Sequence, residues 1–143
     1  MSRSTFEHVN LTVTDLPRVL HFVQTALPDW RVRGGGTMDW FGQPIDWCHV
    51  GTDEAYIALQ SGGNTEALDW QSLATGVKHI GLVVPDVDAV VQRLTDAGFP
   101  LDHWGGQTAV RRSAYVVAPG SVQFEFVQYN SADPALRNDY STV

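Results

Sequence analysis

The stretch HVNLTVTD, at residues 8–15, has a counterpart 71 positions later in HIGLVVPD, at residues 79–86. Each stretch begins with a histidine, continues with alternate apolar residues as a strand does, and ends with an aspartate that can cap a helix. The two stretches therefore predict two copies of one strand-into-helix unit. If the copies are related by a pseudo-twofold axis, His8 and His79 can meet although they are distant in sequence.

A helix is predicted after each stretch. Beyond Asp15, apolar residues keep the spacing of one buried helix face as far as Leu27, and Pro28 ends the helix. Pro85-Asp86 opens the second helix, and Gly98 is placed to end it in a left-handed conformation. Strand-like segments follow at residues 30–33, 45–50 and 56–60, and again at 101–104, 112–117 and 122–129. The predicted fold class is α+β: two βαβββ modules form a cup-shaped mixed sheet with the helices on the convex side.

The length of 143 residues predicts one domain, because either half alone would bury too little apolar surface to be stable. We expect module 1 at about residues 5–62, a linker at 63–76, module 2 at 77–130 and a C-terminal tail at 131–143. Each module then depends on the other for its stability.

Composition narrows the possible partners. A net charge of -7, without a basic cluster, argues against nucleic acid as a partner. No signal peptide and no apolar run of membrane-spanning length is present, so we expect a cytoplasmic protein with no membrane partner. Cys48 is the sole cysteine, which excludes an internal disulfide and a multi-cysteine metal cluster.

Side-chain alternation predicts which face of the sheet carries the chemistry. In VQFEFV, at residues 122–127, Phe124 and Phe126 share one face and Glu125 takes the other. The same alternation sends His8 and His79 away from the helices. Two imidazoles and one carboxylate suit a divalent first-row metal and leave three positions of an octahedral ion open.

The chain resembles the vicinal oxygen chelate superfamily, which includes glyoxalase I, extradiol dioxygenases, fosfomycin-resistance enzymes and bleomycin-resistance proteins. The resemblance covers residues 6–129. It is carried by the two histidine-led stretches and by PGSVQFE, at residues 119–125, which is similar to the family's turn before its last metal ligand.

The resemblance implies four metal positions, one on the first and one on the last strand of each module. His8, His79 and Glu125 fill three of them, and Ala58 aligns with the fourth. Extradiol dioxygenases also have no protein ligand at this fourth position. The resemblance therefore implies Fe(II), with Mn, Zn or Ni as possible substitutes. A small-molecule substrate chelated through adjacent oxygens and a homodimer are implied as well. The alternatives are a glyoxalase I-like isomerase or lyase and a metal-free, bleomycin-resistance-like binding protein.

Strand pairing predicts the neighbours of the metal. A hairpin turn at residues 51–54 would set His49 opposite Tyr56 and Trp47 opposite Ala58, so that Trp47 fills part of the vacated ligand space. A turn at residues 118–121 would set Ala114 opposite Glu125. His49 and Tyr56 are then candidate catalytic residues, although a structural histidine bonded to Tyr56 is the alternative.

Further pocket residues follow from the same alternation. The candidates on the face predicted for the metal are Asn10, Gln60 and Arg112. Asn10 and Arg112 suit an anionic or oxygen-rich substrate. A salt-bridged Arg112 and a rim position for Gln60 are the alternatives.

Overall fold

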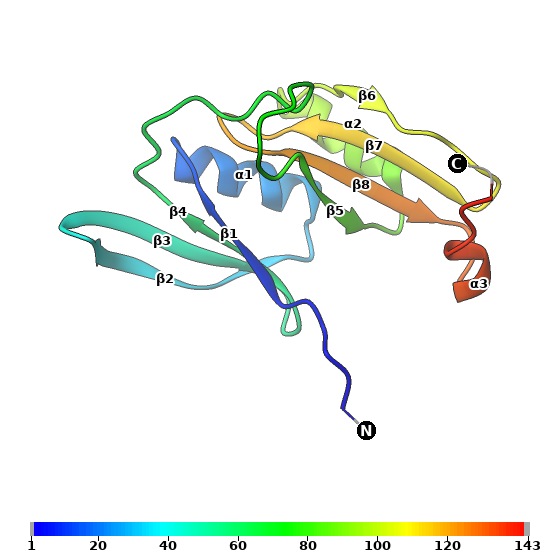
Figure 1. Cartoon of the computed structure of the whole chain (residues 1–143), viewed down its shortest axis with the longest axis horizontal. Helices are drawn as coiled ribbons and strands as arrows, with labels where there is room; N and C mark the ends of the chain where they lie inside the picture. The colour runs from blue at the N-terminus through cyan, green and yellow to red at the C-terminus, as the bar shows by residue number, and fades with distance from the viewer. Residues whose placement is uncertain (1, 142–143) are drawn as a thin grey trace. The chain divides into compact units, whose positions relative to one another are not determined.

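A computed structural model describes residues 2–141 of the chain (Figure 1). Within that range the elements are β1 (His8–Thr12), α1 (Leu16–Ala26), β2 (Arg31–Trp40), β3 (Gln43–Gly51), β4 (Tyr56–Gln60), β5 (His79–Val83), α2 (Val87–Asp96), β6 (His103–Trp104), β7 (Arg111–Val117), β8 (Gln123–Tyr129) and α3 (Pro134–Arg137).

The described residues form two four-stranded mixed sheets with strand orders β1-β4-β3-β2 and β5-β8-β7-β6. In each sheet the first strand pairs in parallel with the last, and the other pairs are antiparallel. The predicted α+β class and the two βαβββ modules are confirmed. The chain divides into two compact units, which we call unit 1 (residues up to Ala67, with Pro119–Ser121) and unit 2 (Leu68–Ala118 with Val122 onward).

In unit 1, α1 packs against β3 and β4. The helix begins as predicted, because the Asp15 carboxylate accepts a hydrogen bond from the Arg18 amide at 3.1 Å. Its buried side chains are Val19, Phe22, Val23 and Ala26. The buried face is therefore rotated slightly from the predicted one, since Phe22 is completely buried whereas Leu20 is only partly so.

In unit 2, α2 packs against β7 and β8. The Asp86 carboxylate caps the helix by accepting a hydrogen bond from the Ala89 amide at 3.0 Å. Gly98 adopts a φ of 89° just beyond the helix, in the left-handed region that favours glycine. Phe124 and Phe126 are completely buried on the helix side of the sheet, as alternation predicted.

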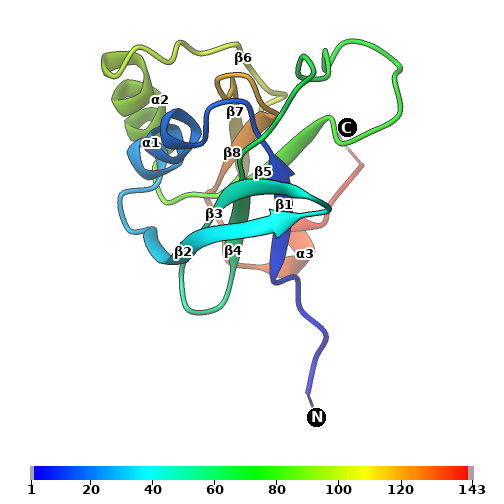
Figure 2. The same ribbon diagram turned by 90° about the vertical axis from the view of Figure 1, so that its left-hand side faces the viewer.

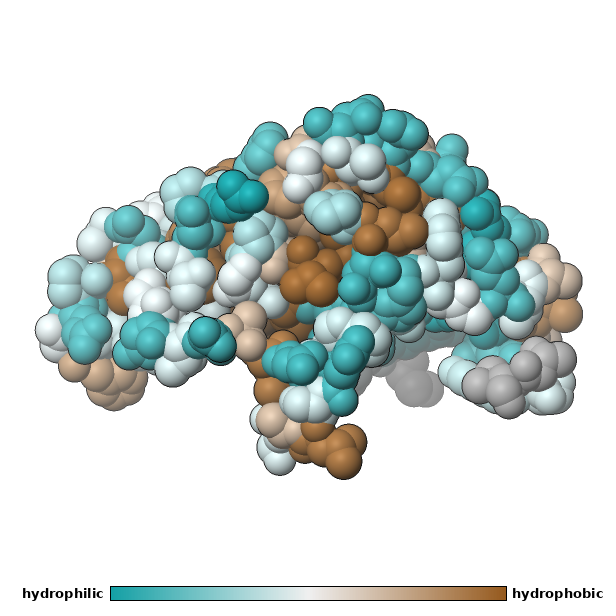
Figure 3. Space-filling model, turned by 90° about the horizontal axis from the view of Figure 1, so that it is seen from above, coloured by the Kyte–Doolittle hydropathy of each residue, from teal (hydrophilic) through white to brown (hydrophobic). Residues whose placement is uncertain are grey.

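Strand β2 is longer than predicted and runs through three consecutive glycines. With β3 it forms a long hairpin (Figure 2), whose tip exposes the ring of Phe41 at 91%. The helix α3 lies in the tail, where no element was expected. Hydrophilic residues cover most of the face in Figure 3, with hydrophobic residues in separate groups. No helix in residues 2–141 is long and apolar enough to span a membrane.

Both predicted hairpin registers were wrong. In unit 1 the turn is Thr52–Ala55, closed by a 2.8 Å hydrogen bond from the Thr52 amide to the Ala55 carbonyl, so His49 lies opposite Ala58 and Trp47 opposite Gln60. In unit 2 the turn is one residue longer than predicted, because the Ala118 amide bonds to the Val122 carbonyl. Tyr115, rather than Ala114, therefore lies opposite Glu125.

Candidate functional site

The two sheets place their first histidines in equivalent positions. His8 opens β1 and His79 opens β5. Two residues further along, Asn10 pairs with Ala58 in unit 1 and Gly81 pairs with Glu125 in unit 2. The strand registers thus confirm that Ala58 occupies the position equivalent to Glu125. Only unit 2 carries a carboxylate there.

The Glu125 carboxylate is surrounded by side chains of unit 2. One oxygen, Oε1, accepts a hydrogen bond from Arg111 Nη2 at 2.8 Å, and the other, Oε2, lies 3.2 Å from His79 Nε2. The Tyr115 hydroxyl donates a further hydrogen bond to the carboxylate. We call these four residues, Glu125, His79, Arg111 and Tyr115, the Glu125 cluster.

The Glu125 cluster holds its carboxylate ionised. Glu125 is only 6% exposed, and burial opposes its ionisation, but the hydrogen bonds from Arg111 and Tyr115 outweigh burial and lower its pKa. Burial raises the pKa of Tyr115, and the hydrogen bond to Glu125 raises it further, so this hydroxyl keeps its proton and acts as a donor. Burial opposes the charge of Arg111, but its interactions with Glu125 and Tyr129 together outweigh burial and raise the pKa of Arg111.

Aromatic rings extend the Glu125 cluster along the same face. The His79 ring meets the Tyr115 ring edge-on, with 5.3 Å between the ring centres. On Tyr115 the ring of His103 is stacked at 4.4 Å. Trp70, from the segment between the modules, stacks on His103 at 5.0 Å. Asp102 accepts hydrogen bonds from Gln123 at 2.9 Å and pairs with His103 Nδ1 at 2.7 Å. These contacts fix the imidazole of His103 in one orientation.

The equivalent face of unit 1 is a row of rings. Tyr56 stacks on His8 at 4.7 Å and on His49 at 4.5 Å, and Trp47 follows His49 at 4.9 Å. The Arg33 guanidinium lies 4.3 Å from the centre of the Tyr56 ring. We call the four rings, His8, Tyr56, His49 and Trp47, the unit 1 ring row. It contains both predicted catalytic residues, His49 and Tyr56, and one predicted metal ligand, His8.

The surroundings of His49 in the unit 1 ring row favour its neutral form. Burial lowers the pKa of His49, and the charges of His8 and Arg33 lower it further. His8 Nδ1 lies 2.8 Å from the Glu7 carboxylate, and this hydrogen bond lowers the pKa of Glu7. Burial raises the pKa of Tyr56, as does the nearby charge of Glu7. His49 is therefore available as a proton acceptor near neutral pH.

The remaining predicted pocket residues make contacts of their own. Asn10 donates a 3.0 Å hydrogen bond to Gln60, which is 6% exposed, so these two predicted residues meet within unit 1. Arg112 instead points to the helix side, where it binds Asp88 of α2 at 2.7 and 3.0 Å. The reason is the longer turn of unit 2, since a shift of one residue moves a side chain to the other face of a sheet.

Arg111 and Tyr115 were not predicted from the sequence. They alternate with Ser113 in RRSAY, at residues 111–115, and all three share the face of Glu125. The Ser113 hydroxyl also lowers the pKa of Glu125, although it makes no well-aligned hydrogen bond within residues 2–141. The alternation puts these three residues on one face, but whether this is the face of Glu125 depends on the length of the turn between β7 and β8.

The His79–Glu125 pair fits two neighbouring positions on one metal ion. Ligands bound at about 2.1 Å in a tetrahedral or octahedral site lie about 3.0 to 3.4 Å apart, and the observed N···O distance is 3.2 Å. Within residues 2–141, no three His, Cys, Asp or Glu side chains form a complete metal-binding group. Gly81 leaves the space over the pair open, since an added Cβ would meet only Glu125 Oε2, at 3.9 Å.

Comparison with known proteins identifies the fold. No protein-family model and no curated protein matches the chain. Among solved structures, it is similar to a glyoxalase/bleomycin resistance protein/dioxygenase domain from Frankia, with 22% identity and a TM-score of 0.72 over 90% of this chain and 100% of that one. A glyoxalase family protein from Bacillus cereus gives 15% identity and a TM-score of 0.74 over 92% and 99% of the two chains.

The fosfomycin resistance protein FosX from Listeria monocytogenes is also similar. It gives 16% identity and a TM-score of 0.69 over 96% of this chain and 100% of that one, and that structure is a complex with Mn(II) and 1S,2S-dihydroxypropylphosphonic acid. The chain thus has the fold of the vicinal oxygen chelate superfamily, as the sequence resemblance implied.

Proposed function

We propose that the protein is a metal-dependent enzyme that acts on a small substrate chelated through adjacent oxygens. In this proposal His8, His79 and Glu125 bind one divalent ion, Fe(II) first and Mn, Zn or Ni as substitutes. The observation that carries it is the buried, ionised Glu125 carboxylate, with its Oε2 atom 3.2 Å from His79 Nε2. The same chain or the partner in a homodimer supplies His8.

When bound, the ion would act as a Lewis acid that stabilises negative charge on the substrate oxygens. The residues of the chain have three roles around it. Arg111 holds Oε1 of the Glu125 carboxylate and leaves Oε2 for the ion, and Tyr115 donates a further hydrogen bond to the carboxylate. Because the pKa of His49 is lowered, its neutral imidazole accepts a proton from the substrate, and Tyr56 fixes the ring by stacking on it.

The proposed reaction class is closest to that of extradiol-type dioxygenases. A glyoxalase I-like reaction needs the fourth ligand, a carboxylate that also moves a proton, and Ala58 offers none. Mn(II) in the similar FosX structure supports a divalent ion for this fold. Asn10 and Gln60 form the substrate-binding edge in unit 1, and Arg112, which is paired with Asp88, has no part in it.

One observation favours a second candidate, a metal-free binding protein for an aromatic small molecule. Arg111 and Tyr115 already bind the Glu125 carboxylate, so Glu125 needs no metal ion to offset its burial. The exposed part of the unit 1 ring row would then stack on the ligand.

Elemental analysis separates the two functions. The protein is reconstituted with Fe(II) or Mn(II) and desalted, in the wild-type form and as Glu125→Ala, with Glu54→Ala as the control because Glu54 is exposed in the hairpin turn of unit 1. We expect about one ion per chain in wild type and control, and at least a tenfold lower content in Glu125→Ala. No bound ion in the wild type would instead identify the metal-free binder.

Reaction type needs a separate assay. The Fe(II)-loaded protein is incubated with catechol-type substrates and dioxygen, and ring cleavage is followed by absorbance. Cleavage that disappears in Glu125→Ala supports the dioxygenase. An enzyme that binds metal but turns over only α-keto hemithioacetals would refute the dioxygenase and support the glyoxalase-like reaction.

A further inference from the structure

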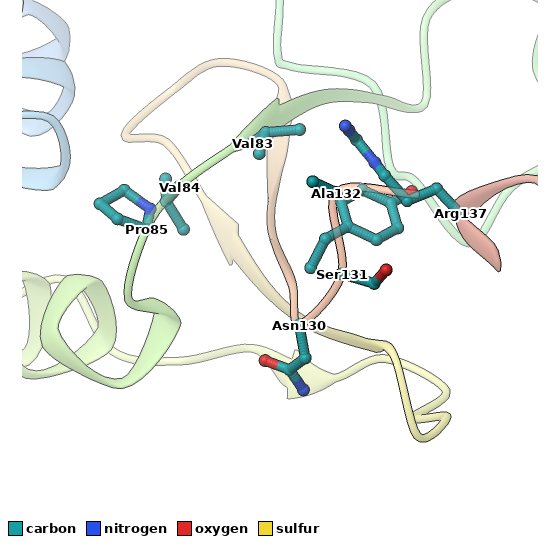
Figure 4. Close-up of a pocket in the computed structure, with 8 residues that line it drawn as sticks. Val83, Val84, Pro85, Asn130, Ser131, Ala132 and Arg137 are labelled. Carbon is teal, nitrogen blue, oxygen red and sulfur yellow. The ribbon is translucent and has the colours of Figure 1, made fainter. Parts of the chain in front are cut away.

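Unit 2 contains two pockets that share one pair of side chains, Tyr129 and Arg137. The first pocket, about 540 Å³, lies between the end of β5 and the segment Asn130–Ala132 (Figure 4). The second, about 410 Å³, is lined by the β6–β7 loop at residues 106–110 and by the tail at residues 136–140. In Figure 4 the Arg137 side chain reaches from α3 toward Val83 and passes beside Ala132.

The 410 Å³ pocket is lined by two guanidinium groups. Arg137 lies 4.2 Å over the Tyr129 ring, and Arg111 lies 6.0 Å from the centre of the same ring. Arg111 donates to Glu125 through one nitrogen, and a guanidinium has five N–H donors. Arg137 forms no salt bridge with a carboxylate in residues 2–141.

The other charged group in the lining is a carboxylate with a local role. Asp139 accepts a hydrogen bond from the Ser141 amide at 2.9 Å, and its pKa is lowered by its hydrogen bonds with Ser141. The charge of Arg111 is offset by Glu125, and Asp139 is bonded to Ser141, so Arg137 is the cation of the lining that has no salt bridge within residues 2–141. The guanidinium of Arg137, together with the N–H donors that Arg111 does not use on Glu125, favours an anionic ligand.

Apolar side chains line a second part of the pocket, beside Gln107 and Thr108. They are Val110 from the loop and Leu136 and Tyr140 from the tail, with Leu136 exposed at 46% and Tyr140 at 75%. A ligand that covers these side chains gains hydrophobic stabilisation, as an inorganic ion would not. Charge and lining together fit an acid that has an apolar body.

We propose that the 410 Å³ pocket binds a small organic acid. Its anionic group lies between Arg111 and Arg137, and its apolar body packs against Val110 and Leu136. The site requires no metal ion, so it goes beyond the proposed function. Because Arg111 also donates to Glu125, the bound acid would contact the Glu125 cluster through Arg111 and lie one side chain away from the Glu125 carboxylate.

Isothermal titration of chelator-treated protein tests the pocket. The probes are benzoate and phenylphosphonate, with benzamide as the uncharged counterpart. We expect at least one of the two acids to bind with a millimolar or lower Kd, at least tenfold more tightly than benzamide, and more weakly as salt is added. Equal affinity for benzamide and both acids, or no binding of either acid, would overturn the proposal.

Variants assign the binding to this pocket. Arg137→Met should weaken acid binding at least tenfold, whereas Arg137→Lys, which keeps a cation, should weaken it less. Arg31→Met is the control, since Arg31 is an exposed residue of unit 1 paired with Asp53. If Arg137→Met binds the acids as wild type does, the proposal is wrong. Acid binding without metal uptake would sink the proposed function alone, and metal uptake without acid binding would sink the pocket alone.

Discussion

Units 1 and 2 share a strand order and a parallel first pairing, but they use the face that carries the histidine in different ways. At the third position of the parallel pairing, the last strand has Ala58 in unit 1 and Glu125 in unit 2. Opposite these residues lie His49 in unit 1 and Tyr115 in unit 2. In unit 1 the methyl group of Ala58 lies beside stacked rings. In unit 2 the carboxylate of Glu125 is bonded to Arg111 and to the Tyr115 hydroxyl.

The difference shows what a buried carboxylate requires of its neighbours. Glu125 is tolerated because Arg111 donates to it across the sheet, while the face around Ala58 has stacked rings instead. Duplication of the backbone therefore did not duplicate the chemistry. The four predictions below test this comparison, from the largest expected effect to the smallest.

Introducing a carboxylate into unit 1 should have the largest effect. Ala58 is 8% exposed and lies opposite His49 of the unit 1 ring row, so Ala58→Glu would bury a charge there without a cationic partner like Arg111. We therefore expect the free energy of unfolding to fall by about 3 kcal/mol. Urea denaturation measures the change. Ala67→Glu, at an exposed loop position, is the control and should change stability by less than about 0.5 kcal/mol. A stable Ala58→Glu protein would mean that the two faces are interchangeable.

Two adjacent arginines provide the next test. Arg111→Met leaves Glu125 without its guanidinium partner and should destabilise the protein by about 2 kcal/mol. Arg112→Met removes an ion pair with the exposed Asp88 and should destabilise the protein less than Arg111→Met does, because water screens this pair. Chemical denaturation of both variants gives the comparison. Equal losses would contradict the special role of Arg111.

Two tyrosines provide a smaller test. Tyr115→Phe removes a hydrogen bond to the buried Glu125 carboxylate and should cost about 1 kcal/mol. Tyr56→Phe removes a 3.4 Å contact with the exposed Glu7 and should destabilise the protein less than Tyr115→Phe does. Thermal unfolding ranks the two. A larger loss in Tyr56→Phe would reverse the comparison between the units.

The smallest effect is expected for the pH dependence of the stability that the Asp88–Arg112 ion pair contributes. The hydrogen bond from Arg112 lowers the pKa of Asp88 from its ordinary 3.8. A carboxyl whose folded pKa is lowered stabilises the protein fully above its unfolded pKa and loses that contribution as the pH falls through the folded value. The stability difference between wild type and Asp88→Asn should therefore shrink when urea denaturation is repeated near pH 3 instead of pH 7. A constant difference would show that the charge of Asp88 is not involved.

Much of the fold followed from local sequence signals. The capping aspartates Asp15 and Asp86 act within a few residues, and the structure has both helix starts where they were predicted. The equivalence of Ala58 and Glu125 was also predictable, because it depends on the repeat rather than on turn geometry. The helix α3 was missed because its single turn is too short to show a periodic pattern.

The neighbours of the site were harder to predict. The turn after β7 has one residue more than expected, and this exchanged the two faces, so Arg112 was chosen although Arg111 faces Glu125. In unit 1 the turn begins at Thr52, whose hydroxyl accepts hydrogen bonds from the Glu54 and Ala55 amides. Side-chain bonds of this kind decide register, and alternation alone does not reveal them.

The most direct test of the central claim is calorimetric titration of Mn(II) into wild type and Glu125→Gln. The proposed three-ligand site predicts one Mn(II) per chain in the wild type, and affinity lowered at least tenfold in Glu125→Gln. Circular dichroism of both proteins verifies that the fold is retained. Equal Mn(II) binding by the two proteins, or none by the wild type, would contradict the claim that Glu125, the carboxylate that only unit 2 carries at this position, is a metal ligand.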